Sequence, residues 1–325
     1  MEKQHLLVSS APHLKSGETV ERAMRDTMLA LLPVTLVAVY FFRLYAVFFI
    51  AVCMGTAALT EVVFRRLKNM PHSLGDGSAL LTGLLVALCY SATTSWWKGA
   101  LATVIAVGIA KEMMGGLGWN RFNPALFGRV SMILLGPWFV NIGTEFMQWN
   151  VNFGPVDVMT HATPLAMMHQ GLELPGVANL LIGFPGGAMG EVSPLALILG
   201  GGYLLYRGHI NWRIPVSILA TVFVMAGITG QNPFLHMVTG GLMLGAFFMA
   251  TDWVTSPITQ KGKWIFGTAI GLFIVLFRIG LAPTEGVAFS ILIMNAFVPR
   301  IEKMTRRIPF SEPKEKPVRR MALSE

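Results

Sequence analysis

The sequence predicts an all-α integral membrane protein with ten transmembrane helices in two inverted repeats of five. Three observations lead to this fold class: an apolar composition, ten long apolar segments, and motifs that recur along the chain. Of the 325 residues, 54% are hydrophobic and 13% are charged, whereas soluble domains carry roughly 25% charged residues. The net charge of +8 does not indicate nucleic acid binding, because the basic residues gather in alternate connections and near the C-terminus.

The apolar segments are long enough to be membrane spans, which need about 20 residues to cross ~30 Å of hydrocarbon. No signal peptide is expected, because the first 25 residues are polar and of mixed charge. The ten expected spans are 26–42, 44–64, 78–92, 96–114, 123–140, 178–206, 214–229, 235–251, 263–281 and 284–299. The third span is short, and glycines between Gly183 and Gly190 interrupt the sixth. Broken backbone at membrane depth is tolerated where it is buried in protein or lines a cavity.

The distribution of Lys and Arg predicts the orientation of these spans. Basic residues occupy the N-terminal stretch, every second connection and the C-terminal tail, and none lies between 141 and 176. We therefore expect both termini in the cytoplasm and the long central connection outside. The expected domains are a cytoplasmic tail 1–25, a first repeat 26–140, an external loop 141–177, a second repeat 178–299 and a basic cytoplasmic tail 300–325.

Short motifs recur in the two halves in the same order. The matching segments are Gly75–Leu80 with Gly190–Leu195, and Asn123–Leu126 with Asn232–Leu235. A repeat of five spans contains an odd number of crossings, so the second copy is expected upside down. Inverted repeats place function at their interface, often beside interrupted helices. Asp76 and Glu191 then occupy equivalent positions on opposite sides.

Three further motifs resemble those of one protein family. They are Ser10–His13, the glycine-rich Gly115–Ala125 and Ala250–Pro257. The chain resembles the RnfD proteins of the Rnf electron-transport complex, a ferredoxin–NAD oxidoreductase that couples electron flow to ion pumping. It is also similar to the NqrB proteins of the sodium-pumping NADH–quinone reductase, whose usual longer N-terminal extension is not seen here, which favours the Rnf family. The family fold resembles the urea-transporter architecture.

The segment Asp157–Thr163 resembles the family's motif for covalent attachment of FMN. That motif is Asp, two residues, Ser or Thr, usually Gly, then Ala-Thr. Asp157, Thr160 and Ala162 match it, and His161 replaces the usual Gly. The resemblance implies that the flavin phosphate is esterified to Thr163, and a covalent bond suits a loop without basic residues. It also implies a second flavin, riboflavin, bound without a covalent bond, for which Asn120, Asn123 and Asp252 on the cytoplasmic side are the candidates.

The resemblance implies a relay that works inside a complex. Cys53 and Cys89 lie in separate apolar segments, so no iron–sulfur cluster is expected here, and no metal site is expected. The family's partners are a periplasmic flavoprotein subunit, membrane subunits with an iron–sulfur centre, and cytoplasmic subunits for ferredoxin and NAD. A flavin transferase is expected for maturation, and the location is a bacterial or archaeal cytoplasmic membrane.

Ionisable residues inside a membrane are costly and suggest function. Asp76, Glu191 and Asp252 are predicted to shape a polar path or a flavin pocket. Arg129 and Arg278 can equally snorkel or pair with acids, and Lys111 and Glu112 are expected at the cytoplasmic interface. His161 and His169 can contact the isoalloxazine, although ordinary loop histidines are the simpler interpretation.

Two other functions stay open from the sequence. One is a passive channel for a small solute, which the urea-transporter-like repeat favours. The other is a scaffold protein whose flavin motif is vestigial. Neither the coupling ion, Na⁺ or H⁺, nor the direction of electron flow follows from the residues.

Overall fold

A computed structural model describes most of the chain between residues 19 and 306. The described residues are 19–71, 73–91, 94–146, 163–170, 172, 176–184, 186–280 and 285–306, with no side-chain description at 137–146, 169 and 177. Within these ranges every regular element is a helix. The predicted all-α class is therefore confirmed for the described part of the chain.

The elements fall into two sets along the sequence. Those up to residue 146 are α1 (Val20–Leu67), the 3₁₀ turn η1 (Leu74–Asp76), α2 (Ser78–Leu88), α3 (Trp96–Val104), the π-helix η2 (Ile105–Met113) and α4 (Pro124–Phe146). Those from residue 164 are α5 (Pro164–Gln170), α6 (Val177–Ile182), the 3₁₀ turn η3 (Met189–Glu191), α7 (Pro194–Arg207), α8 (Arg213–Ile228), α9 (Pro233–Val238), α10 (Leu242–Leu244), the π-helix η4 (Gly245–Met249), α11 (Gln260–Gly280) and α12 (Gly286–Thr305).

The first two expected spans form α1, which bends at one residue. Arg43 has φ 52° and ψ −137°, a left-handed conformation that costs energy for a residue with a side chain. The helical stretches on either side match 26–42 and 44–64, but the first begins earlier, at Val20, where the Thr19 hydroxyl accepts a hydrogen bond from the Arg22 backbone N–H. A single arginine thus makes the whole connection.

Several expected spans are short or broken. α2 has 11 residues, about 16 Å at 1.5 Å per residue, and the sixth span is divided into α6, η3 and α7 as its glycines predict. The expectation of one continuous helix over 235–251 is wrong. Gly240 and Gly241 have φ of 65° and 67°, and the chain there forms α9, α10 and η4 instead.

The surface of the helices is strongly apolar. Two helices, α1 and α11, are long and apolar enough to cross a membrane, and three apolar stretches are shorter: Ser78–Leu88, Pro124–Gly136 and Arg213–Ile228. Large side chains such as Leu36, Tyr40 and Leu199 are exposed along them. Exposed apolar surface on this scale is unusual for a soluble monomer and is consistent with a multi-pass membrane protein.

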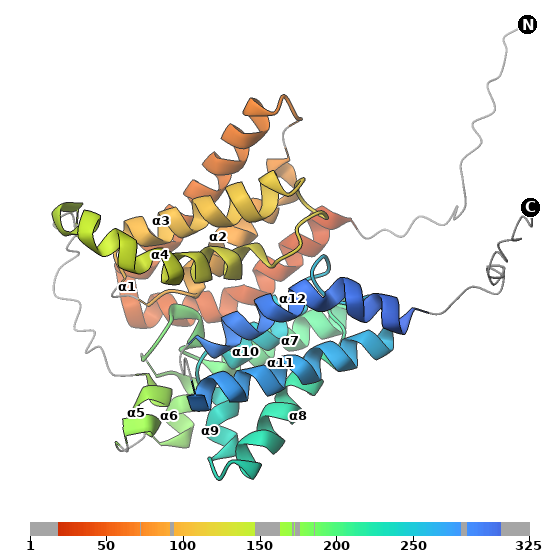
Figure 1. Cartoon of the computed structure of the whole chain (residues 1–325). Helices are drawn as coiled ribbons and strands as arrows, with labels where there is room; N and C mark the ends of the chain where they lie inside the picture. Colours follow the sequence, from red (N-terminus) through yellow and green to blue (C-terminus); the bar gives the residue numbers. More distant parts are fainter. Residues whose placement is uncertain are drawn as a thin grey trace, which may run out of the picture.

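The helices pack as two groups that meet along α1 and α4 (Figure 1). α1 contacts α2 and α3 in its own group and α7 in the other, α11 lies between α8 and α12, and α12 contacts α4. The start of α1 and the end of α12 lie on the same side of the molecule, and α5 lies on the opposite side (Figure 1).

The matching motifs adopt similar local structures. In each half a 3₁₀ turn that ends in an acid, Asp76 or Glu191, precedes a helix, α2 or α7. Asn123 and Asn232 each accept hydrogen bonds from backbone N–H groups in the first turn of a helix that begins with proline. The sequence similarity therefore corresponds to similar turns and helix starts at these positions.

Candidate functional site

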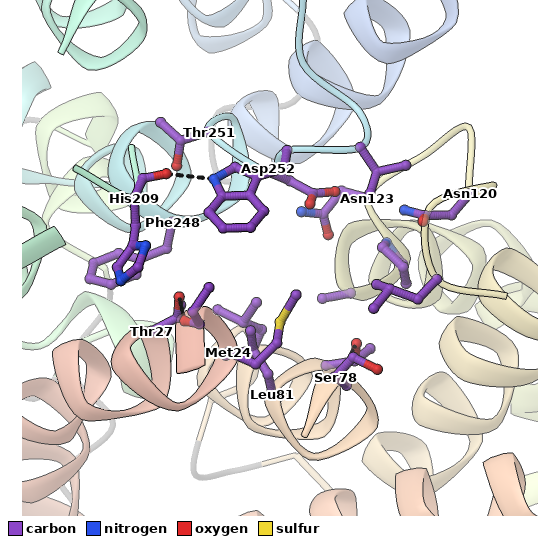
Figure 2. A pocket seen from close by; sticks show the side chains of 18 of the residues that line it. Met24, Thr27, Ser78, Leu81, Asn120, Asn123, His209, Phe248, Thr251 and Asp252 are labelled. Carbon is purple, nitrogen blue, oxygen red and sulfur yellow. Dashed lines mark hydrogen bonds between the residues drawn. The ribbon is translucent and has the colours of Figure 1, made fainter. Parts of the chain in front are cut away.

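A cavity of about 310 Å³, called the large cavity below, lies between the two groups of helices. Its volume is at the lower end of the range for small-molecule sites. Leucine and phenylalanine side chains make up much of its lining, among them Leu81, Leu85, Phe247 and Phe248. Its polar lining residues are Thr27, Ser78, Thr82, Lys111, Asn120, Asn123, His209, Thr251 and Asp252. In Figure 2, Thr27 and Ser78 lie on one side of the cavity and His209, Thr251 and Asp252 on the other, with Asn120 and Asn123 at the right of the view.

A glycine-rich turn places the two asparagines in this cavity. Gly115, Gly116 and Gly118 have φ between 89° and 119°, a region in which glycine avoids the steric penalty of a side chain. The turn brings the chain back from η2 to Asn123, whose Oδ1 accepts a hydrogen bond from the backbone N–H of Leu126 at 3.2 Å. The glycine signature is therefore explained by backbone geometry.

Asn123 also joins three parts of the chain. Its Nδ2 donates to the carbonyl of Met249 at 3.1 Å, and its backbone N–H donates to Oδ1 of Asn295 at 3.2 Å. Asn295 in turn donates to the carbonyl of Thr255 at 2.9 Å. The start of α4, the end of η4, and α12 are thus held together beside the cavity.

Asn120 has a buried acceptor atom that the protein leaves unused. Its Nδ2 donates to the carbonyl of Phe122 at 3.3 Å, whereas its Oδ1 has no hydrogen-bond partner among the described residues. A buried polar atom without a partner costs about 1–3 kcal/mol. Asn120 lines the cavity, and its amide oxygen is an acceptor of the kind that the imide N–H of a flavin requires, so the chemistry of the lining fits that group.

Asp252 contributes a carboxyl group to the cavity. Its Oδ2 accepts a hydrogen bond from the Thr255 hydroxyl at 3.0 Å. Burial raises the pKa of Asp252 above its usual value, and the hydrogen bonds from Thr255 and from the backbone N–H groups of Val254 and Trp253 oppose this effect. The carboxyl group therefore takes up a proton more easily than an exposed aspartate does.

A buried ion network lies behind the cavity. Lys111 Nζ is 3.1 Å from Glu61 Oε1 and donates to Ser78 Oγ at 2.6 Å. Arg65 Nε lies 3.4 Å from Glu61 and 3.5 Å from Glu112. Lys111 and Glu112 are both nearly inaccessible. Charges can be buried here because opposite charges lie beside them.

Asp76 supports this network without lining the cavity itself. Its Oδ1 accepts hydrogen bonds from the backbone N–H of Ser78 at 2.8 Å and from the Ser78 hydroxyl at 2.6 Å. Ser78, which does line the cavity, is fixed between Asp76 and Lys111. The predicted role of Asp76 as a pocket residue is therefore indirect.

Glu191 lies in a second, small cavity of about 30 Å³, together with Arg129, Glu285, Gly240 and Gly241. Arg129 forms a two-pronged ion pair with Glu285, at 2.8 and 2.6 Å. Asp76 and Glu191 therefore do not share a site.

Arg278 adjoins the small cavity and stabilises the break in the 235–251 segment. Its guanidinium is fully buried and donates to the carbonyls of His236, Thr239 and Gly240 at 2.6, 2.7 and 3.3 Å. Arg129 thus pairs with an acid, Glu285, whereas Arg278 binds backbone carbonyls.

Thr163 lies near the small cavity, at the start of α5. Its Oγ1 accepts a hydrogen bond from the Ala166 backbone N–H at 3.1 Å. A Cβ added at Gly187 would lie 3.5 Å from Thr163 Cγ2 and 2.9 Å from Glu191 Oε2, so Thr163 and Glu191 flank the same glycine. Asp157, Thr160, His161 and Ala162 lie outside the described residues, as does the side chain of His169.

The structure thus gathers part of the predicted site and adds residues that the sequence did not single out. Asn120, Asn123 and Asp252 line one cavity, and Ser78, Lys111 and His209 line it with them. The only sequence signal for Lys111 was a charge at the end of an apolar segment.

Comparison with known proteins gives consistent matches over the whole length. The model of the NQR2, RnfD, RnfE family matches residues 7–311. The chain is 40% identical over 310 residues to the D subunit of the Na⁺-translocating ferredoxin:NAD⁺ oxidoreductase complex of Acetobacterium woodii, covering 94% of this chain and 95% of the relative. It is 38% identical to the D subunit of the proton-translocating ferredoxin:NAD⁺ oxidoreductase complex of Clostridium ljungdahlii, covering 95% and 97%. It is 33% identical to the D subunit of the ion-translocating oxidoreductase complex of Sodalis glossinidius, covering 92% and 97%.

Proposed function

The chain belongs to the NQR2, RnfD, RnfE family, and we propose that it is the membrane flavoprotein subunit of an ion-translocating ferredoxin:NAD⁺ oxidoreductase complex. In this role it relays electrons through flavins and takes part in coupling their flow to Na⁺ or H⁺ transport. It is one component of an oxidoreductase and does not catalyse the overall reaction alone. Relatives at 40% and 38% identity are named for different ions, so overall similarity does not choose between Na⁺ and H⁺.

The observation that carries the proposal is the pairing of Thr163 with a separate cavity suited to a second flavin. Thr163 is half-buried, and its hydroxyl is the group that a phosphoester with FMN requires. In the large cavity, the unused acceptor of Asn120 and the apolar side chains suit the edge and the faces of riboflavin. Bound flavins supply the electron-carrying chemistry, and the protein supplies position and electrostatics.

The residues around the large cavity would fix such a ligand and the charge near it. Asn123 holds the cavity's α4 edge to η4 and α12. Lys111 presents an ammonium group through Ser78, and a positive charge near a flavin ring favours its reduced, more negative form. The apolar side chains exclude water.

The proposed topology has ten spans in two inverted repeats, with both termini in the cytoplasm and the Thr163 loop outside. The termini of the described helices lie opposite α5 (Figure 1), which supports this arrangement. FMN then lies near the outer face and riboflavin near the inner face. The proposed partners are the other Rnf subunits, including the periplasmic flavoprotein and iron–sulfur subunits, with a flavin transferase for maturation.

Mass spectrometry of the Thr163 peptide tests the covalent flavin. In protein produced with a flavin transferase, the peptide should carry the mass of FMN, and the denatured band should fluoresce in a gel. Thr163→Ala should abolish both signals, whereas the control Thr229→Ala, an exposed threonine outside the motif, should keep both. An unmodified wild-type peptide would contradict the covalent FMN and favour a solute channel or a scaffold. Normal complex activity in Thr163→Ala would favour the scaffold.

A further inference from the structure

A buried polar cluster outside the proposed flavin-binding residues joins α1 to the turn after α7. The Asp26 cluster consists of Asp26, Tyr203, Arg207 and His209. Asp26 Oδ2 accepts hydrogen bonds from Arg207 Nε at 3.0 Å and NH2 at 2.8 Å, and it lies 2.6 Å from His209 Nε2. The Tyr203 hydroxyl donates to Asp26 Oδ1 at 3.4 Å. The ion pair between Asp26 and Arg207 would by itself hold α1 against α7, so it does not explain why a histidine also contacts Asp26.

His209 lies between this cluster and the large cavity. Its side chain lines the cavity while its Nε2 faces Asp26, and it is labelled beside Phe248 and Thr251 in Figure 2. Its backbone carbonyl accepts a hydrogen bond from the Trp253 indole N–H, and the two rings lie 6.0 Å apart between centroids. The imidazole is therefore held at a fixed place in the cavity lining.

The other end of the cluster reaches the surface. The Arg207 side chain is 28% exposed, whereas those of Asp26 and His209 are 9% and 7% exposed. Water thus has access to the outer end of a chain of polar groups whose inner end is the imidazole. The neighbouring leucine and phenylalanine side chains of the cavity offer no such connection.

Three titratable side chains of the described residues line the cavity, and they differ in their suitability for passing a proton. Lys111 is held by Glu61 in a buried ion pair at 3.1 Å. Asp252 accepts a hydrogen bond from the Thr255 hydroxyl. His209 differs from both in its position, because its ring lines the cavity while its Nε2 faces Asp26, and an imidazole has two nitrogens that can donate or accept a proton. The titratable and charged groups that face His209 or share its cavity are Asp26 on α1, Tyr203 and Arg207 on α7, and Asp252 in the 251–254 segment after η4, where Trp253 packs near the imidazole ring.

We propose that Asp26 and His209 form a proton route from the cytoplasmic surface into the large cavity, where it supplies the proton that accompanies electrons arriving at a bound two-electron carrier. This inference rests on the proposed binding of a flavin in that cavity. It assigns His209 as the residue that hands over the proton and takes up its replacement from water, and Asp26 as the positioning residue that balances the charge of the imidazolium.

The step balances in atoms and electrons. One N–H bond of the His209 imidazolium breaks, and its bonding pair stays on the ring as neutral imidazole. One bond to hydrogen forms on the carrier, which receives its electrons from the reduced partner protein of the complex. A proton from water then binds to the neutral ring and restores the imidazolium, whose positive charge the Asp26 carboxylate balances. General acid catalysis of this kind typically contributes 10²- to 10⁴-fold to a rate.

Single-turnover reduction of the purified complex tests the route, with a pH indicator recording proton uptake and flavin absorbance recording reduction. His209→Gln should slow both about 100-fold and remove their pH dependence, while acid-released riboflavin stays at the wild-type amount. Asp26→Asn should give the same direction of change. The matched control Tyr203→Phe, which loses only the 3.4 Å contact to Asp26, should behave as wild type.

Chemical rescue separates a proton-transfer role from a structural one. His209→Ala should regain rate on addition of imidazole, in proportion to the imidazolium concentration, because a free imidazolium can occupy the vacated space. Wild-type kinetics and pH profile in His209→Gln would overturn the inference, as would a slow His209→Ala that imidazole leaves slow. A wild-type complex without riboflavin would instead overturn the proposed flavin site itself.

Discussion

Three consecutive glycines on α7 give a graded test of how the two groups of helices fit together. A Cβ at Gly200 would lie 2.0 Å from the backbone carbonyl oxygen of Ala30 on α1. A Cβ at Gly201 would lie 2.5 Å from Cδ1 of the Phe247 ring, and one at Gly202 would meet nothing within 4 Å. The same substitution, glycine to alanine, therefore meets backbone, a movable ring or open space.

The expected effects differ in sign. Alanine gains about 1 kcal/mol over glycine inside a helix, and Gly202→Ala should keep this gain. Overpacking typically costs 1–3 kcal/mol, and the Ala30 carbonyl cannot move without α1. The contact with rigid backbone places the cost in the upper half of that range, so after the helix gain Gly200→Ala should be destabilising by about 1–2 kcal/mol. Gly201→Ala should be nearly neutral in stability, but the displaced Phe247 ring, which lines the large cavity, should lower the amount of bound riboflavin.

The assay is chemical denaturation of the detergent-solubilised protein, followed by tryptophan fluorescence, with flavin extracted by acid from each variant. The expected order of stability is Gly202→Ala, wild type, Gly200→Ala. Equal midpoints for Gly200→Ala and Gly202→Ala would refute the close contact between α1 and α7. Full riboflavin content in Gly201→Ala would refute the placement of Phe247 in the ligand's cavity.

Two further predictions concern residues in the lining of the large cavity. Asn123→Ala removes both the cap at Leu126 and the donor to the buried Met249 carbonyl, so the free energy of unfolding should fall by about 2–4 kcal/mol in total. Asn123→Ser keeps a capping hydroxyl and should lose less stability in the same denaturation assay. Equal losses in the two variants would contradict the cap. Because burial raises the pKa of Asp252, the folded protein binds that proton more tightly than the unfolded chain does. Its stabilising contribution is therefore present at low pH and lost as the pH rises above ~3.9 through the raised pKa. The free energy of unfolding of wild type, relative to that of Asp252→Asn, should fall over that pH range. A difference that does not change with pH would contradict the raised pKa.

Bends and breaks that depend on residues adjacent in the chain were predictable from the sequence. The bend at Arg43 follows from a charge between two apolar segments, and the break after Ile182 follows from its glycines and proline. Asn120, Asn123 and Asp252 were named together because of the family resemblance, and they line the same cavity; their role in binding a second flavin stays a prediction. The covalent flavin at Thr163 stays a prediction.

The features that escaped prediction depend on partners far away in the chain. The break at Gly240 is stabilised by Arg278, 38 residues later, and Lys111 is buried because Glu61 lies beside it, 50 residues earlier. The pairing of His209 with Asp26 spans 183 residues. Apolar runs and local turns do not report such contacts, because each depends on how the helices pack.

The two cavities are separated by very little protein. Asn123 and Phe248 line the large cavity, while Leu126 and Met249, close to them in the chain, line the small one. The bond from Asn123 to the Met249 carbonyl closes this layer. An ion could pass only by displacing packed atoms and shedding its water, whereas an electron can tunnel through a short packed layer. The same few residues would thus let electrons tunnel while blocking ions. Under the proposed function, such a barrier would prevent an ion leak from dissipating the ion gradient.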